Sequence, residues 1–289
     1  MKKNILVCII HLLSLQVFSQ YPLYTLLPSG VSGIVFGDTL LNTRTVLQRE
    51  GIKKITAIQT SSRSHSSFTT MYKVTDGRIE ARYWCYRPAP DTAFRFCQHD
   101  TLLYDIQKRL QEYRAGNSND PFLKMMYEYK TDSNVSITSI MKDPRKLVAD
   151  TSIYHQGYNG KGQLTSQHYE PGAPYPLNAN LYYNKDGLPD SIRHEDPTWE
   201  AYTFSHKRKG KKLLLILETT NGTHKWTYNA TGQCIASEWT SKFLSRSPNS
   251  DVRKLFTEIK YEYNADGTLS KVVEKRTNEK IITAYTYER

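Results

Sequence analysis

The sequence predicts a mainly β fold, an antiparallel meander of repeated β-hairpins that forms a curved sheet or an open barrel-like array, with one or two packed helices. Three observations predict this fold: a recurring Tyr-Asn-x-x-Gly pattern, tyrosines two positions apart before it, and apolar residues at strand spacing after it. Because one isolated hairpin is only marginally stable, the hairpins are expected to pair side by side and bury a shared face.

One copy of the pattern shows why it predicts a hairpin. Tyr261 and Tyr263 are two residues apart and therefore share one face of a strand. The next four residues, 264–267, tolerate positive φ or hydrogen-bond their own backbone, as a tight reversal requires. Leu269 and Val273 then mark a second strand. The pattern begins at Tyr158, Tyr183, Tyr228 and Tyr263, weaker copies cover 72–79 and 127–134, and a degenerate hairpin surrounds Gly210.

The C-terminal copy resembles a known repeat. Its Tyr-x-Tyr, the following Gly-x-Leu and the second Tyr-x-Tyr at Tyr285 and Tyr287 resemble the YD repeats of RHS-type proteins. The resemblance covers mainly residues 150–289 and, faintly, 67–141. It implies a large curved β-sheet, in some members a shell around a toxin, that binds partners or carbohydrate. The family's self-cleaving Asp-Pro-x-Gly-Leu motif does not occur in this sequence.

Residues 1–19 have the layout of a cleavable secretory signal peptide. Lys2 and Lys3 precede an apolar run that ends near Phe18, and the small Ser19 follows. The run is shorter than the roughly 20 apolar residues that span a bilayer. We therefore expect an exported chain, periplasmic, cell-surface or secreted, with no transmembrane segment after cleavage. Loss of the two lysines would lower its formal net charge from +11 to +9, which favours acidic partners.

Two stretches depart from the β pattern. Leu103, Ile106, Leu110 and Tyr113 step by three, four and three residues, which predicts an amphipathic helix near 101–115. Residues 39–50, with Asp38 before them and Gly51 after them, predict a weaker second helix. We expect a mixed β domain over 20–149 that contains the first helix, followed by YD-like hairpin repeats over 150–289.

Three cysteines follow the predicted signal peptide. Cys85 and Cys97 flank a turn-forming segment that contains Pro88 and Pro90, so the sequence predicts a disulfide between them in an exported protein. Cys234 is left over. We interpret it as a small buried residue on a strand rather than a reactive thiol.

The sequence contains no spacing that predicts catalysis, a cofactor or a metal. His-Glu-x-x-His, Gly-x-Ser-x-Gly and Walker-type loops do not occur in it. His194, Glu195 and Asp196 could ligate a metal beside a predicted turn, but a solvated strand end before Pro197 is the simpler interpretation. We expect no catalytic, cofactor-binding or metal-ligating residues.

A ligand-binding face is the remaining candidate. Positive charge is densest at Lys207, Arg208, Lys209, Lys211 and Lys212, which could grip a polyanion or make a hairpin tip soluble. Exposed tryptophans stack on sugars, and the candidates are Trp199, Trp226 and Trp239, although cross-strand packing is their commoner use.

These features favour one function over its alternative. The favoured function is an exported, non-catalytic binding or scaffold protein of the cell envelope, whose partner is a polyanion, a glycan or an envelope protein, without specific nucleic-acid binding. The alternative is a secreted glycan hydrolase with carboxylates assembled across the sheet.

Overall fold

The structure is a computed structural model, and it describes most of the chain from residue 44 onward. The predicted signal peptide, Trp199 and residues 39–43 of the weaker predicted helix lie outside the described residues. The described residues are 44–63, 66–88, 96–107, 109–117, 120–131, 133–142, 149–160, 163–170, 178–186, 188–196, 201–219, 222–231, 233–241, 256–276 and 279–289.

Within these residues the chain forms one short helix and 18 strands, and every pair with a described register is antiparallel. The predicted mainly β meander of hairpins is confirmed. The elements are α3(Arg44–Arg49), β1(Lys54–Ser61), β2(Ser67–Thr75), β3(Arg78–Arg87), β4(Phe96–Tyr104), β5(Leu110–Asn117), β6(Asp120–Thr131), β7(Asn134–Met141), β8(Asp150–Tyr158), β9(Leu164–Tyr169), β10(Ala179–Tyr183), β11(Pro189–His194), β12(Tyr202–Lys209), β13(Lys212–Thr219), β14(Gly222–Tyr228), β15(Cys234–Ser241), β16(Phe256–Tyr263), β17(Leu269–Arg276) and β18(Glu279–Glu288).

The helix α3 confirms part of the weaker predicted helix. It ends before Gly51, which has a φ of 63° and therefore stops the helix as predicted. Leu47 of α3 is buried, with only 1% of its surface exposed, so the helix packs through its apolar side. The sequence signal at the C-terminal end of this helix was sufficient because it acts locally, whereas the predicted start lies outside the described residues.

The chain divides into two compact units that interleave along the sequence. Unit 1 contains the described residues up to Lys53, together with 72–83 and 98–201, and unit 2 contains 54–71, 84–97 and 202–289. The predicted boundary near residue 150 falls between β7 and β8, and these strands pair over eight residues within unit 1.

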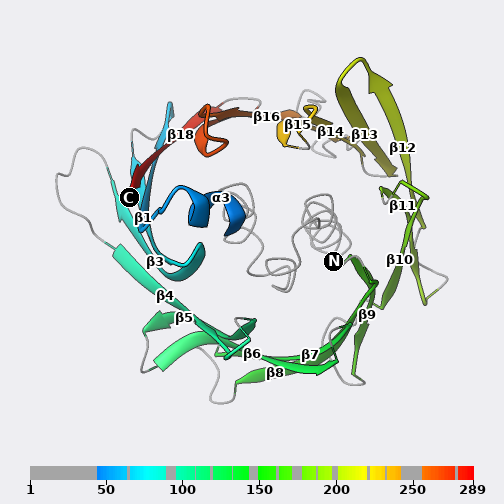
Figure 1. Cartoon of the computed structure of the whole chain (residues 1–289), viewed down its shortest axis with the longest axis horizontal. Coiled ribbons are helices and arrows are strands. Elements are labelled where there is room, and N and C mark those ends of the chain that lie inside the picture. The colour runs from blue at the N-terminus through cyan, green and yellow to red at the C-terminus, as the bar shows by residue number, and fades with distance from the viewer. Residues whose placement is uncertain are drawn as a thin grey trace, which may run out of the picture. The chain divides into compact units, whose positions relative to one another are not determined.

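In unit 1, the strands β4 to β11 follow one another, and each pairs with the next one in the chain (Figure 1). Side chains alternate between two faces of these strands. Tyr113, Met125, Tyr127 and Tyr154 lie on the buried face, each with at most 5% of its surface exposed. The core of this unit is therefore rich in tyrosine.

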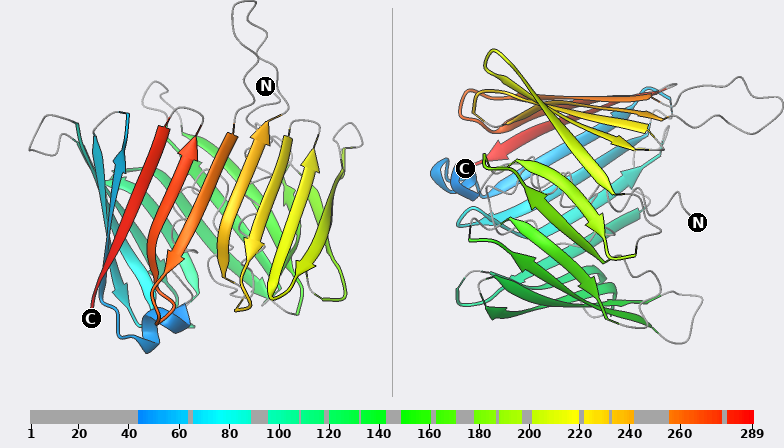
Figure 2. Two further views of the ribbon diagram at one scale, coloured as in Figure 1. Left: turned by 90° about the horizontal axis from the view of Figure 1, so that it is seen from above. Right: turned by 90° about the vertical axis from the view of Figure 1, so that its right-hand side faces the viewer.

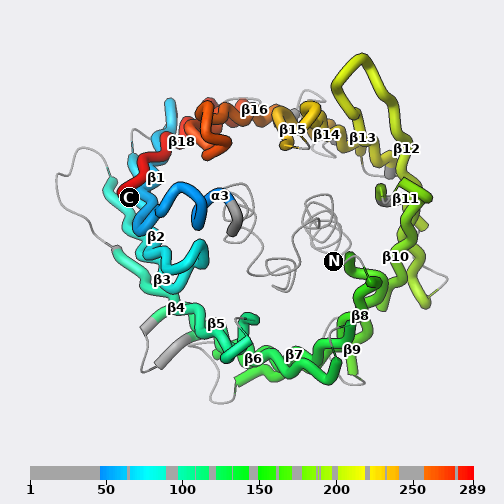
Figure 3. Tube along the Cα trace, viewed as in Figure 1, coloured from blue at the N-terminus to red at the C-terminus, as the bar shows by residue number. Residues whose placement is uncertain are grey.

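In unit 2, the strands β12 to β18 form the same kind of meander, and β18 then pairs with β1 (Figure 3). The register runs from Lys54 opposite Glu288 to Ser61 opposite Ile281. Figure 2 shows these strands side by side. The edge of the last strand is thus covered by the first strand, which removes a surface open to aggregation.

Five of the turns among the described residues share one hydrogen-bonded clasp. In each, the backbone N–H of an Asn or Asp donates to the carbonyl oxygen four residues later, at 2.7–2.9 Å. In three of the Asn copies the side-chain Oδ1 also accepts the N–H of that later residue, at 2.9–3.0 Å. The residues that begin the clasp are Asp105, Asn159, Asn184, Asn229 and Asn264. The conserved geometry explains why Asn follows Tyr in the pattern.

The predicted helix near 101–115 is wrong, because this segment is the β4–β5 hairpin. Its turn belongs to the repeat: Asp105 replaces Asn and accepts hydrogen bonds from Arg109 N and Nε, both at 2.8 Å. Burial raises the pKa of Asp105, but the hydrogen bonds from Arg109 outweigh this and lower it overall. The helical spacing was coincidental, since Leu103 and Ile106 are exposed.

A second hydrogen bond joins successive hairpins, and we call it the tyrosine latch. The hydroxyl of a tyrosine at the end of one strand donates to a carbonyl just after the turn of the preceding hairpin. The five latches are Tyr104 to Ile79 at 2.8 Å, Tyr129 to Leu110 at 2.9 Å, Tyr183 to Leu164 at 2.8 Å, Tyr263 to Cys234 at 2.9 Å and Tyr287 to Leu269 at 2.6 Å. The repeated tyrosine therefore connects neighbouring hairpins.

Loss of one latch should destabilise the protein measurably. We expect Tyr263→Phe to lower the free energy of unfolding by about 1 kcal/mol, because a part-buried carbonyl loses its donor while the ring packing is kept. Tyr182→Phe is the matched control, because Tyr182 is 44% exposed and forms no latch. Urea unfolding followed by circular dichroism measures both, and equal midpoints for the two variants would contradict the role of the latch.

The protein should also lose stability in alkali. Burial raises the pKa of Tyr129, Tyr183, Tyr263 and Tyr287 above the ordinary value near 10. A raised folded-state pKa gives stability that is present below pH 10 and lost as the pH rises beyond it. We expect tyrosinate absorbance at 295 nm from these groups to appear together with loss of the β-sheet signal. Ionisation of all tyrosines near pH 10 in the folded chain would refute this.

Candidate functional site

The β12–β13 hairpin carries the densest positive charge, and its end is the candidate site. We call Lys207, Arg208, Lys209, Lys211 and Lys212 the basic tip. The strands are joined by a two-residue turn whose first residue, Gly210, has a φ of 60°, as a type II′ turn requires. Figure 1 shows this hairpin standing out from β14 at its turn. All five side chains of the basic tip are exposed.

The charges of the basic tip have no acidic partner among the residues that the structure describes. Lys209 and Lys212 are direct cross-strand partners, and like charges in this position destabilise a hairpin. No ion pair to any of the five residues is formed by the part of the chain that the structure describes. The repulsion between Lys209 and Lys212 therefore lowers the stability of the hairpin, and no described ion pair offsets it.

Lysines on neighbouring strands of unit 2 behave differently. Lys225 lies 3.9 Å from Glu238, Lys260 lies 3.0 Å from Glu258, and Lys271 lies 3.5 Å from Glu262, measured from Nζ to a carboxylate oxygen. These are cross-strand or same-strand pairs of the kind that make a solvated sheet face soluble. The basic tip therefore differs from the rest of the charged surface of this unit, where these lysines are paired with glutamates.

Of the three tryptophans predicted for a ligand face, the structure describes Trp226 and Trp239. Trp226 is 3% exposed and its ring stacks on His224 at 5.4 Å, so the prediction that it belongs to an exposed ligand face is wrong. The reason is strand register, which pairs Trp226 with Leu215 on the buried face. Trp239 is half-buried, with its ring 5.8 Å from that of His224. Trp199 lies outside the described residues.

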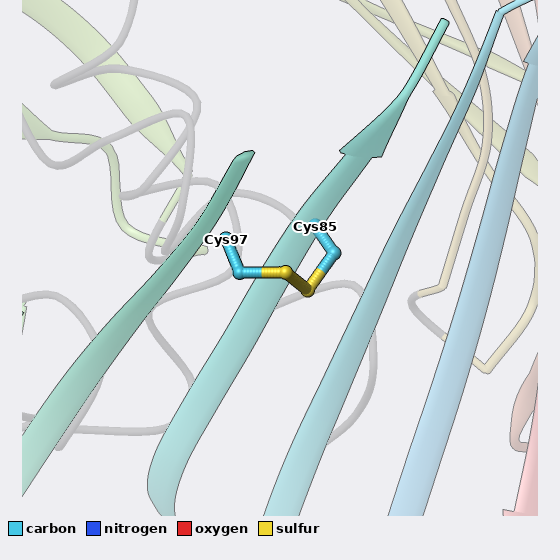
Figure 4. Close-up of a disulfide and its surroundings, with 2 residues drawn as sticks. All are labelled: Cys85 and Cys97. Atoms are coloured by element: carbon cyan, nitrogen blue, oxygen red, sulfur yellow. A yellow bond between two sulfur atoms is a disulfide. The ribbon is translucent and has the colours of Figure 1, made fainter. Parts of the chain in front are cut away.

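Cys85 and Cys97 are joined by a disulfide in the structure (Figure 4). The sulfur atoms are 2.12 Å apart and the Cα atoms 4.1 Å apart, between strands β3 and β4. Cys97 is exposed, so a reductant can reach the bond. Cys234 is 1% exposed, and burial raises the pKa of its thiol to about 12, which agrees with a packed rather than a reactive cysteine.

Three carboxylates that strand pairing brings close to other charged groups are engaged in ion pairs or hydrogen bonds. Register places Glu238 opposite Glu258, but Lys225 contacts the first and Lys260 and Lys275 contact the second. Asp100, which is fully buried, pairs with Arg82 and accepts a hydrogen bond from Gln98 Nε2 at 2.8 Å. This buried ion pair was not predicted, because its two residues are 18 positions apart and only pairing of the strands reveals it.

His194, Glu195 and Asp196, considered as metal ligands because they are adjacent in the sequence, have different contacts in the structure. Glu195 contacts His168, at 3.0 Å from Oε1 to Nδ1, and accepts a hydrogen bond from Asn178. Burial lowers the pKa of His194. No group of three or more His, Cys, Asp and Glu side chains is placed to hold a metal ion among the residues described above.

No helix within the described ranges is long and apolar enough to cross a membrane.

Comparisons with known proteins do not assign a family. No protein-family model matches the sequence, and no curated protein matches it either. Among solved structures, the crystal structure of MucB in complex with MucA(peri) covers 86% of this chain and 93% of that chain, at 12% identity and a TM-score of 0.19. A likeness at this level supports no inference about fold or function.

Reduction of the disulfide should destabilise the chain. The bond closes a loop between residues 12 positions apart, and such a loop contributes about 3 kcal/mol of stability in the chain-entropy description. We expect the urea midpoint to fall on treatment with dithiothreitol and in a Cys85→Ser/Cys97→Ser variant. The same reductant should leave that variant unchanged, and a wild-type midpoint insensitive to reductant would contradict the prediction.

Proposed function

We propose that this chain is an exported, non-catalytic binding or scaffold protein of the cell envelope, which holds an anionic polymer or surface at the basic tip. The observation that carries the proposal is five exposed cations on one hairpin without an acidic partner in the described residues. Uncompensated like charges raise the local positive potential and attract polyanions.

Two further features support the proposal. A signal-like N-terminal pattern and a disulfide are both typical of exported proteins. The strands β12 and β13 pair continuously up to the turn, from Thr203 opposite Glu218 to Lys209 opposite Lys212. A rigid tip places its cations without the cost of ordering a loop on binding.

Binding at such a tip has a definite physical character. Exposed lysines keep their hydration and act as point charges, so attraction to the partner is screened by salt. Specificity for one polymer would need aromatic or hydrogen-bonded contacts in addition to charge. No described tryptophan of unit 2 lies within the β12–β13 hairpin itself, so the cations carry the proposed contact.

The decisive experiment compares two triple variants on immobilised heparin and on inorganic polyphosphate. We expect Lys207→Gln/Lys209→Gln/Lys212→Gln to elute from heparin at clearly lower salt than the wild type and to bind polyphosphate at least tenfold more weakly. Lys225→Gln/Lys260→Gln/Lys271→Gln removes the same charge from paired positions and should elute nearer to the wild type.

Three outcomes would overturn the proposal. Equal losses in the two triple variants would mean that only net charge matters. If the wild type bound neither heparin nor polyphosphate at low salt, a polyanion would be excluded as its ligand. Cleavage of a glycan by the chain, abolished by one Asp or Glu substitution, would replace binding by hydrolysis.

A further inference from the structure

Two histidines of unit 1 are brought face to face by strand pairing. His155 on β8 and His168 on β9 are direct cross-strand partners. Their neighbours Tyr154, Gln156 and Gln167 lie on the buried face, so the two imidazoles lie on the opposite face. Their side chains are 40% and 38% exposed, which leaves both rings open to solvent.

Each imidazole is held by one carboxylate through a single ring nitrogen. Nε2 of His155 lies 3.2 Å from Oε1 of Glu170, and Nδ1 of His168 lies 3.0 Å from Oε1 of Glu195. No hydrogen bond from another described residue reaches the second nitrogen of either ring. Nδ1 of His155 and Nε2 of His168 are therefore available to a ligand.

The carboxylates are themselves fixed. Asn178 Nδ2 donates to Oε2 of Glu195 at 2.9 Å, and Asn178 Oδ1 accepts the backbone N–H of Tyr169 at 2.8 Å. The backbone N–H of Glu170 donates to the carbonyl of Ile153 at 2.9 Å. A carboxylate that accepts one ring N–H orients the imidazole and raises the basicity of the other nitrogen, as in many metal sites.

From this arrangement we infer that His155 and His168 form a surface site for a transition-metal ion of the Zn²⁺, Ni²⁺ or Cu²⁺ class. Cross-strand partners have Cβ atoms about 4.5–5.5 Å apart, so two imidazole nitrogens can reach one ion at about 2.0–2.1 Å. Neutral imidazole suits these three metals. With two protein ligands, water completes the coordination, and the site binds weakly. The site has fewer protein ligands than structural metal sites, which have three or more.

The test measures binding of each metal alone to the untagged chain by isothermal titration calorimetry. We expect micromolar binding of one ion by the wild type, loss of at least tenfold in affinity in His155→Ala and in His168→Ala, and about a tenfold loss in Glu170→Gln/Glu195→Gln. His206→Ala, which removes a histidine from β12, should bind as the wild type does.

A second measurement distinguishes loss of this metal site from unfolding of the variant. Paramagnetic Cu²⁺ should broaden amide signals of β8 and β9 in nitrogen-15 spectra more than those of β5, which lies three strands from β8 in the same unit, while the circular dichroism of each variant matches the wild type. The inference is overturned if the two single His variants keep wild-type affinity, if the wild type binds none of the three ions, or if broadening is centred elsewhere.

Discussion

The hydrogen bond from a tyrosine hydroxyl to a carbonyl of the preceding hairpin is the constraint on which this fold depends. Side chains alternate along a strand, so a slip of one residue would move each buried tyrosine to the solvent face. The latch adds a second penalty, because Tyr129 or Tyr263 would then miss Leu110 or Cys234. Burial and hydrogen bonding thus select the same register.

The clasp and the latch lie at the same ends of the strands, but they fix different parts of the structure. The clasp of Asn229 closes the turn between β14 and β15. The latch of Tyr263 joins β16 to Cys234, the first residue of β15 after that turn. Where the repeat degenerates, the Tyr-Asn pair is replaced by Lys209 and Gly210. A glycine turn supports this hairpin without a side-chain clasp, and its tip carries five cations.

Sequence reasoning was reliable where the signal is local. Asn264 and Gly267 predict a turn by their own backbone preferences, and the repeated tyrosines predict strands, so the hairpins could be found. Asp105 was missed because its turn has no glycine and because Leu103 and Ile106 imitate helical spacing.

Features that depend on strand pairing could not be found from the sequence. Trp226 was expected on an exposed face, and His155 and His168 belong to no common sequence motif, since they are 13 positions apart. Their positions follow from register, which is a property of two strands together. The exposure of the basic tip, by contrast, follows from five cations around one glycine and could be expected.

The pairing of β1 with β18 has a consequence for how the chain is made. Lys54 and Glu288, which meet in this ladder, are separated by 234 positions. During synthesis, β1 leaves the ribosome long before its partner exists, and contacts between such distant residues form slowly. Until β18 emerges, that edge of β1 has open backbone hydrogen-bonding groups, so nascent and truncated chains are the forms most exposed to misassembly.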